Sequence, residues 1–209
     1  MNLIFSLNIH GYSVLGIFWN LFLILIPCLT VYGMTVAAHG RIWKALGWAE
    51  KVAFVALFLY WLFWFPNTAY QFMVPRHLAD YCAHWDKNRV CDTGSWLVPL
   101  FFTYAALGLP AFYYALERMG RLLDGLFLAK PSKGLILFMI PLTTLGVMLG
   151  LFERANSWDV LFSPLALIRQ TLGQLGKPDK LLFFGVFTAS LYLIYYGTDA
   201  FIRLMTRKR

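Results

Sequence analysis

The sequence predicts an all-α membrane protein, a polytopic bundle of about five transmembrane helices with a short amphipathic helix on its outer surface. Its composition and its apolar runs support this prediction. Hydrophobic residues make up 60% of the 209-residue chain, charged residues make up 13%, and the mean hydropathy is +0.63. Such a composition leaves too little polar surface for a soluble globule.

Five apolar runs are long enough to cross a bilayer, whose hydrocarbon core of about 30 Å requires roughly 20 residues of helix. The runs cover residues 13–34, 52–74, 96–116, 134–152 and 181–204. The first run has no Lys or Arg before it and is longer than a signal-peptide core, so we expect a retained helix. No internal repeat or soluble domain is apparent, and residues 1–209 are expected to form one domain.

The second run changes character at Phe65, where the segment FPNTAYQF follows its unbroken apolar part. Proline removes a backbone donor and disfavours helix in the residue before it, so this helix is expected to break or end near Phe65. Freed backbone groups at membrane depth must be satisfied by protein or water. Asn67 is therefore expected to face other helices rather than lipid.

The connection after the fourth run contains a further helical pattern. Its apolar positions approximate one helical face, and they are Val160, Leu161, Leu165, Ile168 and Leu172. Pro164 suits the start of a helix, and Gly173 and Gly176 suit its end. These features predict the amphipathic helix that lies along the outer membrane surface.

Basic residues indicate the orientation, because loops that face the cytoplasm are enriched in Lys and Arg. If the five runs alternate in direction, eleven of the eighteen basic residues share one side. They are Arg41, Lys44, Lys51, Arg118, Arg121, Lys130, Lys133, Arg203, Arg207, Lys208 and Arg209. This pattern predicts an outer amino terminus and a cytoplasmic carboxyl terminus. Contact with anionic lipid explains the net charge of +8 more simply than nucleic-acid binding, which is not expected.

Two of the three cysteines, Cys82 and Cys91, share the outer connection DYCAHWDKNRVCD, while Cys28 lies within the first run. An oxidising compartment permits a disulfide between Cys82 and Cys91, which would close a short loop and restrain its unfolded states. Two free thiols are the alternative, because a sequence cannot prove connectivity.

Two segments that begin in the second and fourth runs carry most of the polar signals: WLFWFPNTAYQFMVPRHL and GLFERANSWDVLFSPLALI. They resemble the FPN segment and the R-x-NSWD signature of a small bacterial integral-membrane family known only as domain of unknown function 1361. The resemblance implies a multi-pass protein of the bacterial cytoplasmic (inner) membrane, without implying an activity. It points to Pro66, Asn67, Tyr70, His77, Arg154, Asn156, Ser157, Trp158 and Asp159 as site residues. The chain departs from the family pattern at Val74 and Leu151, where acidic and arginine side chains are expected.

The alternating topology places both segments on the outer face, where residues far apart in the chain can meet. Polar groups at such depth are costly unless they are paired or line a cavity. The side chains expected to bind a ligand are Asn67, Tyr70, Asn156, Ser157 and Trp158. For catalysis, Asp159 or His77 would act as acid or base while Arg154 holds an anionic group. The structural alternative is an ion pair between Arg154 and an acidic neighbour, with Asn156 and Ser157 capping the surface helix.

A metal site is a further possibility in RHLADYCAHWD, where His77, Asp80 and His84 occur at positions i, i+3 and i+7. In a helix these residues share one face, and two imidazoles with a carboxylate suit zinc or another divalent metal. Asp159 could complete the ligand set. The alternative is that each histidine is solvated or hydrogen-bonded near the membrane surface.

Two functional classes remain. The chain has no G-x-S-x-G elbow, no H-E-x-x-H helix and no glycine-rich phosphate loop. The favoured prediction is a non-catalytic membrane transport or assembly component, in contact with membrane lipid and with a membrane-protein partner. The alternative is an outer-leaflet enzyme that acts on a lipid or envelope precursor, with or without a metal.

Overall fold

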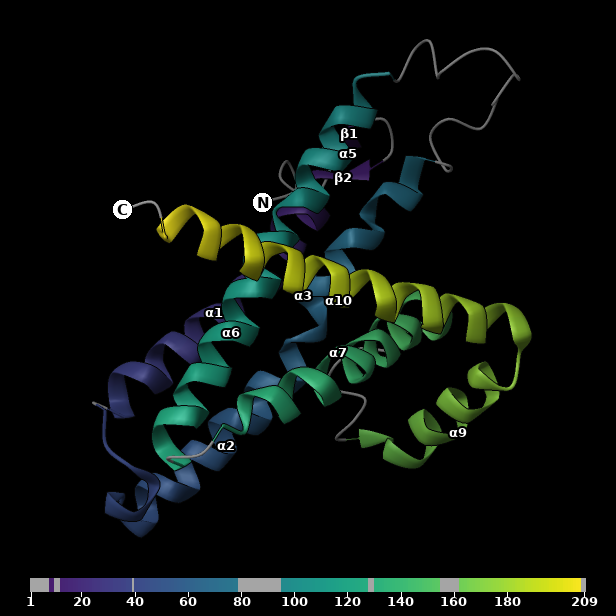
Figure 1. Cartoon of the computed structure of the whole chain (residues 1–209). Helices are drawn as coiled ribbons and strands as arrows, with labels where there is room; N and C mark the ends of the chain where they lie inside the picture. The colour runs from purple at the N-terminus through teal and green to yellow at the C-terminus, as the bar shows by residue number, and fades with distance from the viewer. Residues whose placement is uncertain are drawn as a thin grey trace, which may run out of the picture.

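The fold is a helical bundle, seen here in a computed structural model that describes residues 8–9, 12–38, 40–78, 95–127, 130–154 and 162–207. Within these residues, five helical spans are long and apolar enough to cross a membrane, which confirms the predicted all-α bundle (Figure 1). Each predicted apolar run overlaps one of them. The spans are Leu15–Ala38, Trp48–His77, Leu97–Phe127, Ser132–Glu153 and Pro178–Thr206.

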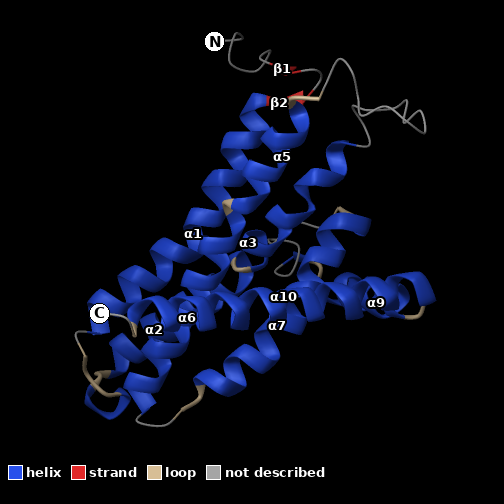
Figure 2. Cartoon of the chain, turned by 45° about the horizontal axis from the view of Figure 1, so that its top comes forward, coloured by secondary structure: helices blue, strands red, loops and turns tan. Residues whose placement is uncertain are grey.

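Several spans consist of more than one element. A two-stranded antiparallel pair precedes the first span and lies beside the start of α5 (Figure 2). The described elements in chain order are β1 (Asn8–Ile9), β2 (Tyr12–Ser13), α1 (Val14–Ala38), η1 (Trp43–Ala45), α2 (Trp48–Trp64), α3 (Pro66–Tyr70), η2 (Gln71–His77), α5 (Leu97–Ala106), α6 (Gly108–Phe127), α7 (Ser132–Met148), η3 (Leu149–Glu153), α9 (Pro164–Leu175) and α10 (Pro178–Thr206).

The second span is interrupted at Phe65, as the FPN segment predicts. Phe65 keeps a helical backbone, with φ −57° and ψ −40°, but α2 ends before it and α3 begins after it. Thr68 N donates to the Phe65 carbonyl three residues back, and the Trp64 carbonyl accepts from Nδ2 of Asn67 at 3.0 Å. The Asn67 side chain therefore satisfies the Trp64 carbonyl two residues before the proline, as a backbone group freed inside a membrane span requires.

The third span is interrupted at Leu107. Pro110 lacks the N–H that would bond to the Ala106 carbonyl, and its ring crowds that carbonyl, so α5 ends at Ala106. The buried side chain of Gln71 donates to the nearby Tyr104 carbonyl at 3.3 Å. Beyond this point α6 continues to Phe127, well past the predicted end at residue 116.

A proline in α7 is compensated by α10. Pro141 cannot donate to the Leu137 carbonyl, and the hydroxyl of Tyr192 donates to that carbonyl at 2.7 Å. Thr188 Oγ1 also donates to Thr144 Oγ1 at 2.9 Å. The two helices thus satisfy each other's polar groups along their contact, while α10 runs at a clear angle to α1 and α6 in both views (Figure 1, Figure 2).

Aromatic side chains fill the centre of the bundle. The ring of Phe65 stacks on Trp61 with centroids 4.7 Å apart and on Phe112 of α6 at 5.5 Å. All three side chains are fully buried. The helix interruption at Phe65 therefore sits in the core, where α2, α3 and α6 meet.

The predicted surface helix is α9, which starts at Pro164. Leu167 and Gln174 are its buried residues, and Gln174 Nε2 donates to Glu153 Oε1 of η3. Most of its other apolar side chains are exposed, including Leu165, Ile168 and Leu172. Exposed apolar side chains at this spacing make α9 amphipathic. No described part of the chain covers its apolar face.

Candidate functional site

The two polar segments are built around a direct contact between α3 and α7. Gly146 packs so closely on Pro66 that a Cβ at position 146 would lie 2.9 Å from the proline's Cβ and Cγ. The FPN interruption is therefore fixed against the fourth span, two turns before the chain reaches Arg154.

The regions flanking these segments share a neighbour in α10. Met73 of η2 and Phe183 of α10 line a recess of about 420 Å³, together with Asp179. The ring of Phe152, two residues before Arg154, lies 5.4 Å from that of Phe183. The chain after the FPN motif and the chain before Arg154 thus border the same part of α10.

The predicted ligand-binding residues of α3 make contacts near their own positions. Asn67 donates to the Trp64 carbonyl, as described above. The hydroxyl of Tyr70 accepts from Nη2 of Arg76 at 3.0 Å, and the guanidinium lies 5.9 Å from the centre of the ring. Both side chains therefore help to hold the broken second span in shape.

His77 and Arg154 occupy the ends of their helices. His77 is the last residue of η2, and its ring lies 6.2 Å from that of Phe101 in α5. Arg154 ends η3 in a left-handed conformation, with φ +54°, and its side chain is exposed. Within the described residues no hydrogen bond or ion pair joins Arg154 to Asn67, Tyr70 or His77.

Several predicted site residues lie outside the described residues: Asn156, Ser157, Trp158 and Asp159 of the R-x-NSWD signature, Asp80 and His84 of the metal triad, and the cysteines Cys82 and Cys91. Among the residues that the structure does describe, no group of three His, Cys, Asp or Glu side chains is arranged to hold a metal ion. The metal triad and the disulfide stay predictions.

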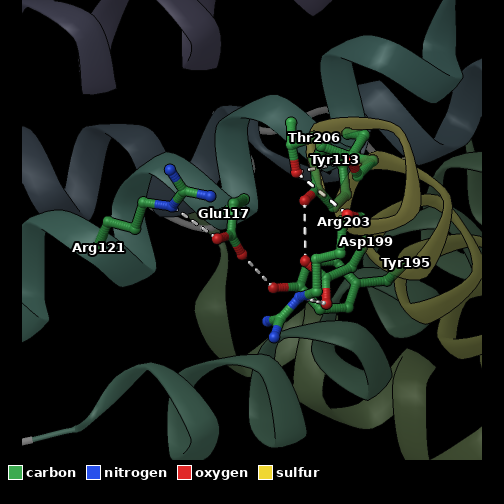
Figure 3. Close-up of polar contacts among 8 residues, drawn as sticks. Tyr113, Glu117, Arg121, Tyr195, Asp199, Arg203 and Thr206 are labelled. Carbon is green, nitrogen blue, oxygen red and sulfur yellow. Dashed lines mark hydrogen bonds and ion pairs between the residues drawn. The ribbon is translucent and has the colours of Figure 1, made fainter. Parts of the chain in front are cut away.

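The structure places a polar cluster between α6 and α10 that the sequence interpretation did not foresee (Figure 3). We call it the α6–α10 clasp. Its members are Tyr113, Glu117 and Arg121 of α6 and Tyr195, Asp199 and Arg203 of α10. Glu117 and Arg121 lie beyond the third predicted run, which ends at residue 116, and the structure corrects this by placing them within α6. Asp199 and Arg203 lie within the fifth predicted run, and the structure places them in α10.

Each carboxylate of the clasp accepts a hydrogen bond from an arginine on its own helix and another from a tyrosine hydroxyl on the other helix. Glu117 accepts from Nε of Arg121 at 2.7 Å and from the hydroxyl of Tyr195 on α10. Asp199 accepts from Nε of Arg203 at 2.8 Å and from the hydroxyl of Tyr113 on α6 at 3.2 Å. Each helix thus donates one tyrosine hydroxyl to the carboxylate of the other. The rings of Tyr113 and Tyr195 have their centroids 5.5 Å apart.

A short repeat in the sequence carries this arrangement. YYALERMGR and YYGTDAFIR, residues 113–121 and 195–203, share tyrosine, carboxylate and arginine at four-residue spacing. That spacing places the three side chains on one helical face. The similarity is a signal that the expectation of no internal repeat overlooked.

The clasp is suited to holding helices together. The carboxylates are mostly buried, with side-chain exposures of 21% for Glu117 and 17% for Asp199, while the arginines reach outward. Each acid has an arginine one turn away, which compensates its charge, and a hydroxyl from the other helix. Satisfied polar pairs of this kind can fix which helices pack together and in which register.

Removing both hydroxyls, with Tyr113→Phe and Tyr195→Phe together, is expected to lower the free energy of unfolding by about 2 kcal/mol, because each carboxylate loses its donor from the other helix. The measurement is SDS-induced unfolding in mixed micelles, followed by circular dichroism. The matched control changes the neighbouring exposed tyrosines, Tyr114→Phe and Tyr196→Phe, and is expected to be neutral. Equal effects of the two double variants would show that the clasp does not join the helices.

Comparison with known proteins yields one match. A protein family described as "Protein of unknown function (DUF1361)" matches residues 19–194. No curated protein and no solved structure matches the chain. The matched range begins in α1, ends in α10 and includes both polar segments and the α6 half of the clasp, while Tyr195, Asp199 and Arg203 lie beyond it.

Proposed function

Because the chain belongs to the DUF1361 family of unknown function, we propose a role from its own geometry: a non-catalytic membrane component that acts in transport or assembly. Five helices capable of spanning a membrane support a multi-pass protein. The proposal places it in a bacterial inner membrane, with the amino terminus outside and the carboxyl terminus in the cytoplasm. The excess of basic residues in one set of connections supports this orientation.

The observation that carries the proposal is that the described carboxylates are bound to other groups of the protein. Six of them lie in the described residues, and each has a partner in the protein. Their partners are Arg41 and Gly47 N for Glu50, Arg121 and Tyr195 for Glu117, Ser132 for Asp124, Gln174 for Glu153, Lys180 for Asp179, and Tyr113 and Arg203 for Asp199.

Most of these pairs join two elements. Glu50 links the start of α2 to Arg41 at 2.8 Å, and Asp124 of α6 accepts from the backbone N of Ser132 at the start of α7 at 3.0 Å. A general acid or base must instead reach the reacting atoms of a substrate. Within the described part of the chain, the carboxylates support assembly of the bundle.

The outer polar site enters the proposal as a binding surface. Asn67 and Arg154 belong to segments that border the same part of α10, and we propose that Asn156, Ser157 and Trp158 complete this surface. Membrane lipid and another membrane protein are the proposed partners. Nucleic acid is not among them, because the basic residues flank membrane spans and suit lipid headgroups.

The test removes the predicted acid, base and metal-ligand side chains of the outer face. A variant with His77→Ala, Asp80→Ala, His84→Ala and Asp159→Asn is expected to restore a deletion strain to wild-type growth in each condition where the deletion has an effect. The reason is that a binding component requires none of these groups as acid, base or metal ligand. Growth rates and the amount of protein in the membrane fraction are measured together.

The matched control carries conservative changes that retain hydrogen bonding, with His77→Gln and Asp159→Glu, and is expected to restore growth equally. A quadruple variant that is present at the normal level in the membrane and fails to restore growth would overturn the non-catalytic proposal. It would favour chemistry at the outer face.

A further inference from the structure

A second recess lies between the end of α1 and the carboxyl-terminal half of α6, helices that run side by side in Figure 1 and Figure 2. Its volume is about 240 Å³, several times the roughly 30 Å³ that a water molecule occupies in the liquid. Its lining residues are Thr35, Ala38, Gly40, Arg41, Arg118, Arg121, Leu122, Gly125 and Leu126. Three of them are arginines and none is acidic, so the recess is a cationic site.

Two of the arginines are held in place by partners. Arg41 pairs with Glu50 at 2.8 Å, and its Nη2 donates to the Ala37 carbonyl at 3.2 Å. Arg121 is bound to Glu117 within the clasp at 2.7 Å. These contacts fix two guanidinium groups at the edge of the recess, and each retains further N–H donors for a ligand.

Arg118 differs from the other two. Its Nε is buried, and no hydrogen-bond acceptor reaches this atom within the described residues. No acidic side chain in that part of the chain forms an ion pair with it either. An arginine remains charged in proteins, and a buried donor without an acceptor is costly. The site therefore has one uncompensated cation and one unsatisfied donor, both at the recess.

The rest of the lining suits an amphiphilic anion. Leu122, Leu126 and Ala38 supply apolar surface beside the arginines. Gly40 and Gly125 leave room, since a Cβ at either position would meet nothing within 4 Å. Guanidinium groups recognise phosphate with paired N–H donors, and basic pockets between membrane helices bind anionic lipid headgroups.

We propose that this recess binds a phosphate group, supplied by an anionic phospholipid headgroup or by free phosphate. The buried Nε of Arg118 donates to a phosphate oxygen, while Arg41 and Arg121 face the same anion. The lipid's glycerol and upper acyl carbons contact the leucines of α6. The site is separate from the outer polar segments and from the role proposed above.

The experiment uses the full chain purified in detergent and stripped of lipid. Phosphatidylglycerol, phosphatidylcholine and inorganic phosphate are added separately, and native mass spectrometry measures the bound species across a titration. The wild-type protein is expected to retain one phosphatidylglycerol or one phosphate more tightly than it retains phosphatidylcholine. Arg118→Gln is expected to weaken that binding about tenfold.

Two glycine variants separate the recess from general effects of mutation. Gly125→Leu fills the recess without removing a charge and is expected to abolish the tight binding. Gly134→Leu changes a glycine of α7 that also has open space around it but lies outside the recess, and it is expected to bind like wild type. Circular dichroism melting curves establish that all three variants fold.

Each outcome has a defined meaning. Tight retention of phosphatidylglycerol that inorganic phosphate does not displace identifies a lipid site, and binding of phosphate alone identifies a site for the free anion. The proposal is overturned if the folded wild type binds neither probe more tightly than phosphatidylcholine. It is equally overturned if Arg118→Gln and Gly125→Leu bind as the wild type does.

Discussion

Replacing Trp61 with alanine is expected to lower the free energy of unfolding by about 3 to 5 kcal/mol, the range for removing a buried tryptophan side chain. Trp61 is fully buried, and its ring stacks between Phe58 at 5.9 Å and Phe65 at 4.7 Å. Inside a membrane the helices gain most of their association energy from van der Waals contact, so the cavity removes that energy directly. SDS-induced unfolding followed by circular dichroism measures the loss.

Two control variants identify the cause. Trp48→Ala removes the same side chain from a position that is 80% exposed and is expected to change stability by less than about 0.5 kcal/mol. Trp61→Phe keeps an aromatic ring in the stack and removes a buried indole N–H that has no acceptor within the described residues. It is expected to cost much less than Trp61→Ala. If Trp48→Ala and Trp61→Ala destabilise equally, Trp61 is not part of a packed core.

Replacing Gly108 with alanine is expected to destabilise the fold by about 3 kcal/mol, the upper end of the range for overpacking. A Cβ at position 108 would lie 2.8 Å from the Thr68 carbonyl oxygen and 2.8 Å from Cβ of Gln71. One of these neighbours is backbone, so α3 must move away from α6. That movement also disturbs the bond from Gln71 to the Tyr104 carbonyl.

Gly185 of α10 provides the matched glycine, because a Cβ there meets nothing within 4 Å. Gly185→Ala is expected to be neutral or to stabilise the helix by up to about 1 kcal/mol, since alanine has the higher helix propensity. Thermal unfolding of both variants in the same detergent gives the comparison. An unchanged midpoint for Gly108→Ala would contradict the close approach of α3 to α6.

The helical spans follow from sequence because their causes are local. Long apolar runs require helices in a bilayer, and Pro66 has no N–H to continue the hydrogen-bond ladder. The end of the third span does not follow in the same way. Glu117 and the arginines near it lower the hydropathy after residue 116, but the helix continues, with Glu117 bound to Arg121 within α6 and to Tyr195 on α10. Such partners belong to the tertiary structure.

In the candidate site, too, the contacts with local causes could be predicted from the sequence and the tertiary contacts could not. The side chain of Asn67 was expected to face protein, and it donates to the Trp64 carbonyl, while Thr68 N bonds to the Phe65 carbonyl instead. The partners of Glu117 and Asp199 lie about 80 positions away, where no local rule connects them. The only sequence signal for them is the repeated tyrosine, carboxylate and arginine spacing in α6 and α10.

The clasp also bears on biogenesis. Glu117 is followed one turn later by Arg121, and Asp199 by Arg203, so each helix carries a neutral ion pair of its own. The tyrosine that completes the Glu117 environment is translated 78 residues later. Until α10 is translated, the ion pair with Arg121 compensates the charge of the Glu117 carboxylate within its own helix. Once inserted, α10 can then pack against α6, and the two tyrosine–carboxylate hydrogen bonds between the helices form last.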